Sequence, residues 1–331
     1  MKKKIYFRAD AGADIGYGHF IRTLALADML KDDFDCMFFT VNPTSYQIAE
    51  MEKVCEYVDL QADTRFNDFL SFLTGDEIVV LDNYFFTTEY QQQIKSKGCH
   101  LVCIDDMHDK YYVADVVINH GFVDECLFDK SSSTKLCLGL GWALLRHPFI
   151  NAIEYPCDKK ENNLFVFAFG GSDPKGLSRQ VADVIERLDY NSIYAIGVLG
   201  DSSNTVIELD KYKKVQFVQR QTATEIAELF KRAGYVILPA STMCLEAIAC
   251  RARLIVGYFV DNQKAFSEYL ALNDYSEDLG DMTDSSFEER LSDVIHRLLS
   301  LSETKYEKRE LLISSDIRIR YKKLFHSLSY I

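Results

Sequence analysis

A histidine and an arginine three residues apart follow a glycine-containing loop near the start of the chain. Gly16, Gly18, His19 and Arg22 lead into residues 21–30, which are rich in helix formers. The two glycines let backbone N–H groups approach a ligand, and the start of a helix attracts anions. The helix dipole also favours a neutral imidazole ring over a charged one. His19 is therefore a candidate proton acceptor, and the alternative is a tight strand-to-helix turn with a solvated histidine.

Polar side chains follow several apolar runs in the first half of the chain. Asp82 and Tyr84 come just after the run at 77–81, which predicts a buried strand. Such strands alternate with helical segments, a pattern typical of a parallel sheet covered on both faces. Ligands of these sheets bind beyond the carboxyl ends of the strands. We expect the following residues at that edge: His19, Asp82, Tyr84, Asp105, Asp106 and Asn119.

A second alternation of strands and helices begins after the polar stretch at 154–163, which predicts a linker. Its first strand, at 164–169, is followed by Gly170, Gly171 and Ser172 and then by a helix. A glycine pair between a strand and a helix can cradle a phosphate, with Ser172 as a further donor. Many such turns bind nothing, so the motif alone leaves both interpretations open.

Two further sites in the second half could bind a nucleotide. Ser241 and Thr242 precede a helix, where their hydroxyls could bind a phosphate or only cap the helix. Glu246 lies one turn further on and could accept hydrogen bonds from two ribose hydroxyls, or simply favour the helix start. Asn262 begins the next helix.

Length and composition indicate a two-domain α/β protein. The chain has 331 residues, of which 48% are apolar and 26% charged, and it is long for a single domain. We predict an N-terminal Rossmann-like domain at 1–153 and a C-terminal one at 154–304. A helical tail at 305–331 is expected to pack on the body.

Charge and cysteine content exclude several classes of protein. The formal net charge of −13 argues against broad nucleic-acid binding, which requires a basic face. No run approaches the ~18 apolar residues of a membrane-spanning helix, and the start lacks the pattern of a signal peptide, so we expect a cytoplasmic protein without membrane insertion. Cys99 and Cys103 are expected to be buried free thiols. No cluster has the spacing of a metal site, and we expect no cofactor.

Four motifs in order along the chain carry a resemblance to a known family. The first runs from Arg8-Ala9-Asp10 to Gly16-Tyr17-Gly18-His19-Phe20-Ile21-Arg22, and the second from Leu138 to Phe149 around Ala143-Leu144-Leu145-Arg146. The third is Phe169-Gly170-Gly171-Ser172-Asp173-Pro174, and the fourth comprises Ser241-Thr242, Glu246-Ala247 and Asn262-Gln263. Together they resemble the PseG family, the UDP-sugar hydrolases of pseudaminic acid biosynthesis, whose nucleotide-binding region is shared with MurG-type transferases.

The resemblance implies a glycosyltransferase-B (GT-B) architecture, in which two doubly wound, Rossmann-like domains face each other across a cleft. It also implies metal-independent hydrolysis of UDP-2,4-diacetamido-2,4,6-trideoxy-β-L-altropyranose, in which water attacks the anomeric carbon with inversion and releases UDP. The implied general base or water positioner is His19. The implied substrate contacts are Gly16, Gly18 and Arg22 on the sugar and phosphate side, Gly170, Gly171, Ser172, Ser241 and Thr242 at the diphosphate, Glu246 at the ribose, and Asp82, Tyr84 and Asn262 at the sugar.

The chain departs from the family pattern at three places. Pro239-Ala240 stands where a glycine is usual, Trp142 replaces a tyrosine, and Arg251-Ala252-Arg253 replaces a Gly-x-Pro turn. The two arginines could form anion contacts or lie on the surface.

Two other functions compete with hydrolysis. A MurG-type transferase would use the same second domain to move the sugar to an acceptor, but the first domain shows no apolar and basic patch for a membrane acceptor. A non-catalytic UDP-sugar-binding protein would bind the nucleotide sugar without turnover.

Overall fold

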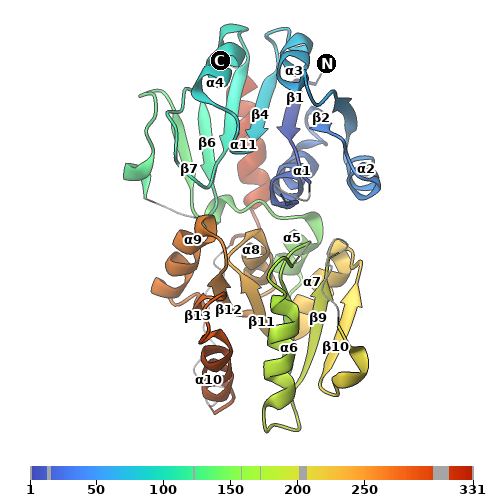
Figure 1. Ribbon diagram of the computed structural model, residues 1–331. Helices are drawn as coiled ribbons and strands as arrows, with labels where there is room; N and C mark the ends of the chain where they lie inside the picture. The colour runs from blue at the N-terminus through green and yellow to red at the C-terminus, as the bar shows by residue number, and fades with distance from the viewer. Residues whose placement is uncertain are drawn as a thin grey trace. The chain divides into compact units, whose positions relative to one another are not determined.

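The computed structural model describes residues 2–12, 16–121, 124–157, 159–171, 173–200, 207–300 and 313–329 (Figure 1). The chain divides into two compact units, Met1–His147 with Ser314–Ile331, and Pro148–Ile313. The division falls at the start of helix α5 (His147–Glu154), before the predicted boundary after residue 153, and the C-terminal helix α11 (Ile317–Ser329) belongs to the first unit.

The first unit is built on a seven-stranded parallel sheet in the order β3-β2-β1-β4-β5-β6-β7. Because the strand order reverses between β1 and β4, the loops that follow these two strands diverge and leave room for a ligand at their carboxyl ends. The strands are β1 (Lys4–Ala9), β2 (Asp35–Val41), β3 (Glu56–Leu60), β4 (Ile78–Asp82), β5 (His100–Ile104), β6 (Val116–Asn119) and β7 (Lys135–Leu138). The other helices are α1 (Gly18–Leu30), α2 (Ser45–Met51), α3 (Arg65–Phe72) and α4 (Thr88–Ser96), with 3₁₀ turns η1 (Glu125–Leu127) and η2 (Leu140–Trp142).

Helices cover both faces of this sheet, which explains why its strands are apolar throughout. Phe38 packs edge-on against Phe20 of α1, with ring centroids 5.4 Å apart. Its neighbour Phe39 points to the opposite face and packs against Phe69 of α3, at 4.9 Å. β4 is buried along its whole length, including Asp82, the residue that ends it.

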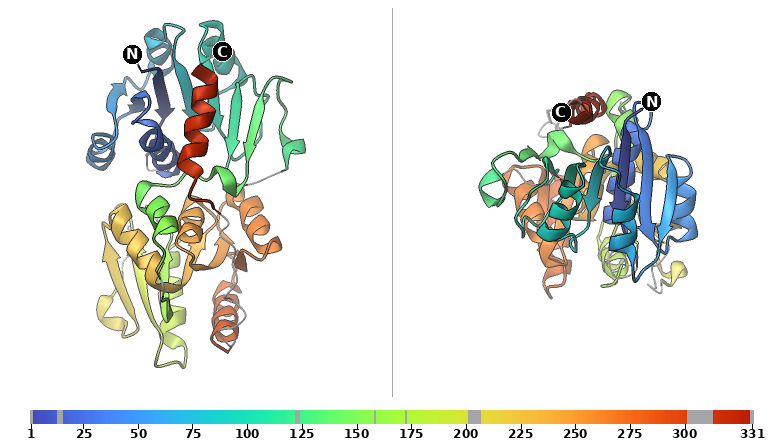
Figure 2. Two further views of the ribbon diagram at one scale, coloured as in Figure 1. Left: turned by 180° about the vertical axis from the view of Figure 1, so that it is seen from behind. Right: turned by 90° about the horizontal axis from the view of Figure 1, so that it is seen from above.

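The C-terminal helix α11 lies against the first sheet in the view from behind (Figure 2). Tyr321 donates a hydrogen bond to the carbonyl oxygen of Trp142 over 2.5 Å, and the two rings pack edge-on. Lys322 pairs with Asp33 at 2.8 Å. Trp142, which departs from the family pattern, therefore forms part of the surface on which α11 packs.

The second unit repeats the same design with six parallel strands in the order β10-β9-β8-β11-β12-β13. Its order reverses between β8 and β11, so the loops after these two strands leave the sheet at neighbouring positions. The strands are β8 (Glu161–Ala168), β9 (Tyr194–Leu199), β10 (Val215–Gln219), β11 (Ala233–Pro239), β12 (Arg253–Tyr258) and β13 (Ser276–Asp281). The helices are α6 (Leu177–Arg187), α7 (Ala223–Arg232), α8 (Thr242–Ala249), α9 (Asp261–Leu272) and α10 (Phe287–Ser300), with a 3₁₀ turn η3 (Leu209–Lys211).

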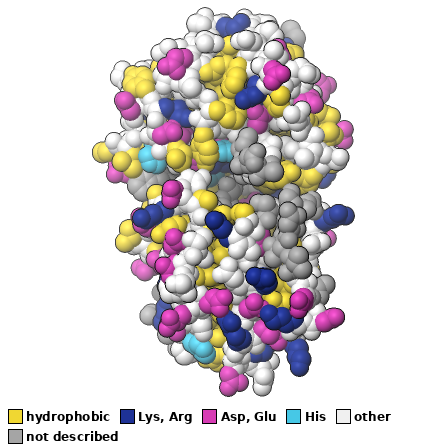
Figure 3. Space-filling model, viewed as in Figure 1, with side chains coloured by type: hydrophobic (Ala, Val, Ile, Leu, Met, Phe, Trp, Pro, Cys, Tyr) yellow, Lys and Arg dark blue, Asp and Glu magenta, His cyan; other side chains and the backbone are white. Residues whose placement is uncertain are grey.

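The prediction of two doubly wound α/β domains is confirmed by the two sheets. Cys99 and Cys103 are buried free thiols, as predicted. None of the helices within the described ranges combines the length and apolarity needed to cross a membrane. On the face drawn in Figure 3, acidic and basic side chains are interspersed over both units.

Arg251 occupies a backbone conformation that normally favours glycine. It follows α8 with a φ of 57°, its N–H donates to the carbonyl of Ile248 (2.9 Å), and the N–H of Ala252 donates to that of Ala247 (3.0 Å). This pair of hydrogen bonds is the Schellman motif, which ends a helix with a left-handed residue. Arg253 instead donates to the Tyr235 hydroxyl at 3.2 Å, so a structural contact occupies one of the two arginines.

We predict that Arg251→Gly raises the free energy of unfolding of the second unit by up to about 1 kcal/mol, because glycine adopts the left-handed conformation without the steric cost of a Cβ. Denaturant unfolding measures the change. Arg251→Ala is the matched control, since it removes the charge and keeps the Cβ. An equal gain in both variants would assign the effect to charge and contradict the backbone explanation.

Candidate active site

The start of α1 combines an open glycine loop with an uncapped helix end. Gly16 has a φ of 78°, and its N–H donates to the carbonyl of Gly12 at 2.8 Å, which closes the loop on itself. A Cβ built at Gly16 or Gly18 would meet no described atom within 4 Å. Tyr17 precedes α1 without a side-chain cap, and the first turn holds no acidic residue. Backbone N–H groups at this helix start are therefore available to an anion or to water.

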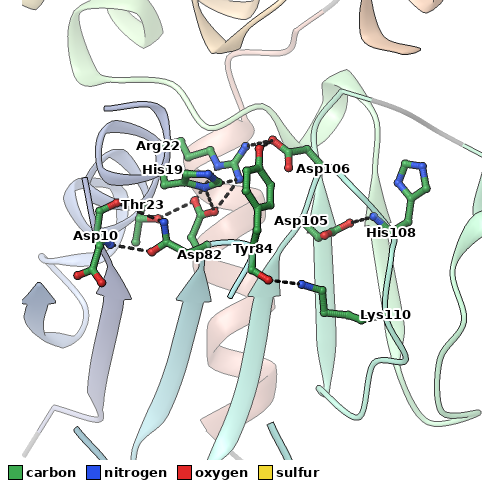
Figure 4. Close-up of polar contacts among 11 residues, drawn as sticks. Asp10, His19, Arg22, Thr23, Asp82, Tyr84, Asp105, Asp106, His108 and Lys110 are labelled. Atoms are coloured by element: carbon green, nitrogen blue, oxygen red, sulfur yellow. Dashed lines mark hydrogen bonds and ion pairs between the residues drawn. The ribbon is translucent and has the colours of Figure 1, made fainter. Parts of the chain in front are cut away.

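Asp82 joins the end of β4 to three residues of α1. Its Oδ1 lies 2.7 Å from Nδ1 of His19 and 2.6 Å from Nη2 of Arg22. Its Oδ2 accepts hydrogen bonds from Nε of Arg22 (2.6 Å) and from Oγ1 of Thr23 (2.9 Å). Figure 4 shows these side chains converging above the carboxyl ends of β1 and β4. The carboxylate of Asp82 thus contacts both His19 and Arg22, the two residues that the sequence singled out.

The contacts of Asp82 determine which ring nitrogen of His19 carries the proton. The side chain of Asp82 is fully buried, which alone would raise its pKa, but the charge of Arg22 and the hydrogen bonds from Arg22 and His19 lower that pKa to about 2. As an ionised carboxylate Asp82 can only accept, so we assign the proton of His19 to Nδ1, although Nη2 of Arg22 also approaches this nitrogen at 3.0 Å. The lone pair of the ring then lies on Nε2, which makes no hydrogen bond within the described residues, and it can take a proton from a substrate.

Arg22 also reaches a second carboxylate, which in turn holds Tyr84. Nη1 of Arg22 donates to Oδ2 of Asp106 at 2.8 Å, and the Tyr84 hydroxyl donates to the same oxygen at 3.3 Å. Burial would lower the pKa of Arg22, but Asp106 and Asp82 raise it well above its ordinary value. The Tyr84 ring stands edge-on to that of His19, with centroids 4.6 Å apart, and is 40% exposed. Tyr84 therefore borders the histidine on its accessible side.

The predicted role of Asp82 as a sugar contact is not supported by its position. No part of its side chain is exposed, and its four hydrogen bonds come from His19, Arg22 and Thr23. Arg22 is likewise buried between two carboxylates. Both residues contact Nδ1 of the histidine, Asp82 at 2.7 Å and Arg22 at 3.0 Å, and can orient its ring.

The sequence did not predict the residues whose hydrogen bonds connect the loops at this edge of the sheet. Thr23 is four residues from His19, which places both on one helix face and could have identified it. Asp10 forms a bidentate pair with the buried Arg8, its backbone N–H donates to Asn83 (2.7 Å), and its Oδ1 accepts from the N–H of Val41 (3.0 Å). The loops after β1, β2 and β4 are thereby tied together, and nothing in the local sequence around each loop signals this.

In the second unit, α8 begins without the cap that its sequence predicts. Ser241 occupies the capping position but makes no side-chain hydrogen bond to the helix, so the interpretation of Ser241 as a simple cap is wrong. The first turn of α8 carries no acidic residue. Its leading N–H groups, with the hydroxyls of Ser241 and Thr242, lie at the carboxyl end of β11 and can receive an anion.

The neighbouring loop after β8 is arranged differently. Gly170 has a φ of 79° and open space where a Cβ would be, whereas a Cβ at Gly200 would lie 2.4 Å from Cα of Gly171. Asp173 accepts from the N–H groups of Leu177 (2.8 Å) and Ser178 (3.0 Å), so the start of α6 already has an anion of its own. Ser172 lies outside the described residues. A phosphate at this loop would have to use the loop amides, not those of α6.

The last two predicted residues differ in accessibility. Glu246 is 1% exposed within α8, so its carboxylate is not presented to a ribose at the surface. Asn262, the second residue of α9, is exposed. The structure thus groups His19, Arg22, Asp82 and Tyr84 in the first unit, while Ser241 and Thr242 emerge beside Gly170 and Gly171 in the second.

We predict that Asp82→Asn lowers the free energy of unfolding at neutral pH by an amount on the order of the 3–5 kcal/mol typical of a broken buried ion pair. The pKa of Asp82 lies near 2, below its ordinary 3.8, so its stabilising effect is complete above about pH 4 and is lost as the pH falls through 2. Denaturant unfolding from pH 6 to pH 3 should show the gap between wild type and variant narrowing in acid. Asp109→Asn, an exposed carboxylate nearby, should cost little. A gap that stays constant down to pH 3 would contradict the assigned ionisation.

Two known proteins resemble this chain over most of its length. No protein-family model matches the sequence. Over 287 residues the chain is 25% identical to the UDP-2,4-diacetamido-2,4,6-trideoxy-β-L-altropyranose hydrolase of Campylobacter jejuni, a similarity that covers 82% of this chain and 97% of that relative. It is 24% identical to the spore coat polysaccharide biosynthesis protein SpsG of Bacillus subtilis over 82% of each chain. The predicted resemblance is therefore confirmed.

The fold also has solved counterparts. The crystal structure of MurG from Acinetobacter baumannii matches with a TM-score of 0.62 and 12% identity over 99% of both chains. At this identity the match shows the fold alone. The predicted GT-B class is confirmed.

Proposed function

We propose that this protein hydrolyses a UDP-linked 2,4-diacetamido-2,4,6-trideoxy sugar to UDP and the free sugar. The observation that carries the proposal is the buried His19–Asp82 pair, whose 2.7 Å contact leaves the outer nitrogen of the imidazole as a proton acceptor. The similarity to the Campylobacter jejuni hydrolase spans nearly the whole length of that relative and supports the choice of substrate.

The reaction uses His19 as a general base. Water attacks the anomeric carbon on the face opposite the nucleotide, and its proton passes to Nε2 of His19. The bond between that carbon and the β-phosphate oxygen breaks, its electron pair leaves with UDP, and the configuration inverts. Asp82 stabilises the imidazolium that forms, as the carboxylate of a catalytic triad does.

The diphosphate is assigned to the second unit. The uncapped start of α8 offers backbone N–H groups and two hydroxyls to a negative group, whereas the guanidinium of Arg22 is already paired with two carboxylates. Gly170, Gly171 and Ser172 are proposed to line the same phosphates, and Tyr84 and Asn262 to contact the sugar. For Glu246 the proposed ribose contact requires a movement that exposes its carboxylate.

We predict that His19→Asn lowers the rate of UDP release from this sugar nucleotide by roughly 10²–10⁴-fold, since asparagine cannot accept the proton. NMR of the product identifies the free sugar and its anomeric configuration, and the assay is run in excess EDTA, in which turnover should persist. UDP affinity, measured by calorimetry, should barely change.

The matched control is His326→Asn, a more exposed histidine of the same unit. Near-normal turnover in His19→Asn would contradict the proposal. Sugar transfer to an added acceptor without hydrolysis would favour a transferase, and UDP-sugar binding without turnover a sensor.

We predict that Ser241→Asp stabilises the second unit and weakens UDP binding. The carboxylate would cap α8 and raise the free energy of unfolding by roughly 0.5–2 kcal/mol. Its charge would repel the diphosphate and lower the affinity for UDP by about tenfold or more. Thermal unfolding and calorimetry report the two effects separately. Thr222→Asp is the control, because Thr222 already caps α7 through the N–H of Glu225 and lies outside the proposed site. Higher stability with unchanged UDP affinity would remove α8 from the phosphate site.

A further inference from the structure

The formal charges of the groups around His19 do not sum to zero. Among the residues that the structure describes, Arg22 is the one Lys or Arg in direct contact with Asp82 and Asp106, at 2.6 Å and 2.8 Å. A general base must be unprotonated, and with a neutral His19 the cluster of these four residues carries one more negative charge than positive charge. A site built to hold the sugar's phosphates would carry the opposite sign.

Neighbouring charged groups at this edge do not cancel the excess. Arg8 forms its bidentate pair with Asp10 and so is already neutralised. Lys110 pairs with Asp109 at 3.3 Å and donates to the Tyr84 carbonyl at 2.9 Å. Asp105 adds no positive charge, and burial raises its pKa. The negative charge therefore stays with the cluster.

Asp106 is the carboxylate through which this charge reaches the accessible side. Asp82 is fully buried, while 29% of the Asp106 side chain is exposed. Its Oδ2 is held by Arg22 and Tyr84, whereas its Oδ1 is buried and makes no hydrogen bond to any described residue. In Figure 4 the Arg22 guanidinium and the Tyr84 ring lie between Asp106 and His19. These contacts hold its charge near the position where a sugar would meet the histidine.

We propose that Asp106 acts electrostatically in the reaction, and that its negative charge stabilises the positive charge that develops on the sugar ring as the bond to UDP breaks. This inference rests on the proposed function. When the C–O electron pair leaves with UDP, the anomeric carbon and the ring oxygen share a positive charge until the oxygen of water bonds to that carbon. A fixed carboxylate near this charge binds the transition state more tightly than the neutral ground-state sugar, which accelerates the chemical step.

The first test compares Asp106→Asn with Asp109→Asn, which removes the same charge three residues away. Asp106→Asn should lower kcat by about 10–100-fold with little change in KM or UDP affinity, and Asp106→Glu should recover part of the loss. Asp109→Asn should leave kcat unchanged. A wild-type kcat in Asp106→Asn would overturn the proposal, as would an equal loss in Asp109→Asn.

The second test does not depend on turnover. The probes are an iminosugar with the 2,4-diacetamido-2,4,6-trideoxyaltrose substituents, whose ring nitrogen is cationic, and the matching neutral 1,5-anhydro sugar, each with UDP present. Wild type should bind the cation about 10–100-fold more tightly, Asp109→Asn should keep this preference, and Asp106→Asn should lose most of it. Absence of a preference in wild type, or its persistence in Asp106→Asn, would overturn the inference. If wild type prefers the cation and Asp106→Asn loses that preference, but wild type does not hydrolyse the UDP-sugar, the proposed function fails while the electrostatic effect of Asp106 on a cationic sugar ring is retained.

Discussion

The buried carboxylate of Asp82 is the interaction on which the candidate site depends. Taking an ionised group out of water costs several kcal/mol unless partners compensate it. Here four hydrogen bonds from His19, Arg22 and Thr23 supply the compensation. Because these donors all lie on one face of α1, the same contacts that offset the burial of Asp82 also fix the orientation of the histidine. The hydrogen bonds that stabilise the buried Asp82 are therefore the same ones that position His19.

The two units use their helix starts in different ways. At α6 the chain satisfies the first-turn N–H groups itself, through Asp173. At α8 the residue in the capping position, Ser241, leaves its hydroxyl unused for this purpose. An uncapped helix start costs stability that a serine cap would have supplied, and such a cost is expected where a ligand completes the hydrogen bonding. The contrast favours α8 over α6 as the proposed phosphate site.

The two units offer groups of opposite charge to the proposed reaction. The proposed site for the leaving diphosphate is rich in N–H donors, and the site proposed for the sugar carries an excess negative charge on Asp106. Cleavage of a glycosyl phosphate separates charge in this same sense, with anion on UDP and cation on the sugar. Arg22 serves this arrangement by holding Asp82 and Asp106 in place rather than by binding phosphate.

Local sequence predicted most of the strands and helices, though not β7, β13 and α10, and it predicted the edge of each sheet where we propose that ligands bind. Continuous apolar runs such as 78–81 predict buried parallel strands, and the polar residues that follow them, Asp82 and Asp106, must meet at one edge because parallel strands end there together. The motif around His19 also identified the family that the chain resembles.

Tertiary structure alone decided what each side chain does at that edge. Asp82 and His19 are 63 positions apart, and only the pairing of β1 with β4 brings them to 2.7 Å, which turns a predicted sugar contact into a buried partner of the histidine. Serine is a residue type that often caps helices, but Ser241 forms no cap. Arg251 adopts a left-handed backbone conformation that its residue type disfavours. The role of Asp82 depends on which groups from distant parts of the chain reach its carboxylate, and a one-dimensional pattern does not record that meeting.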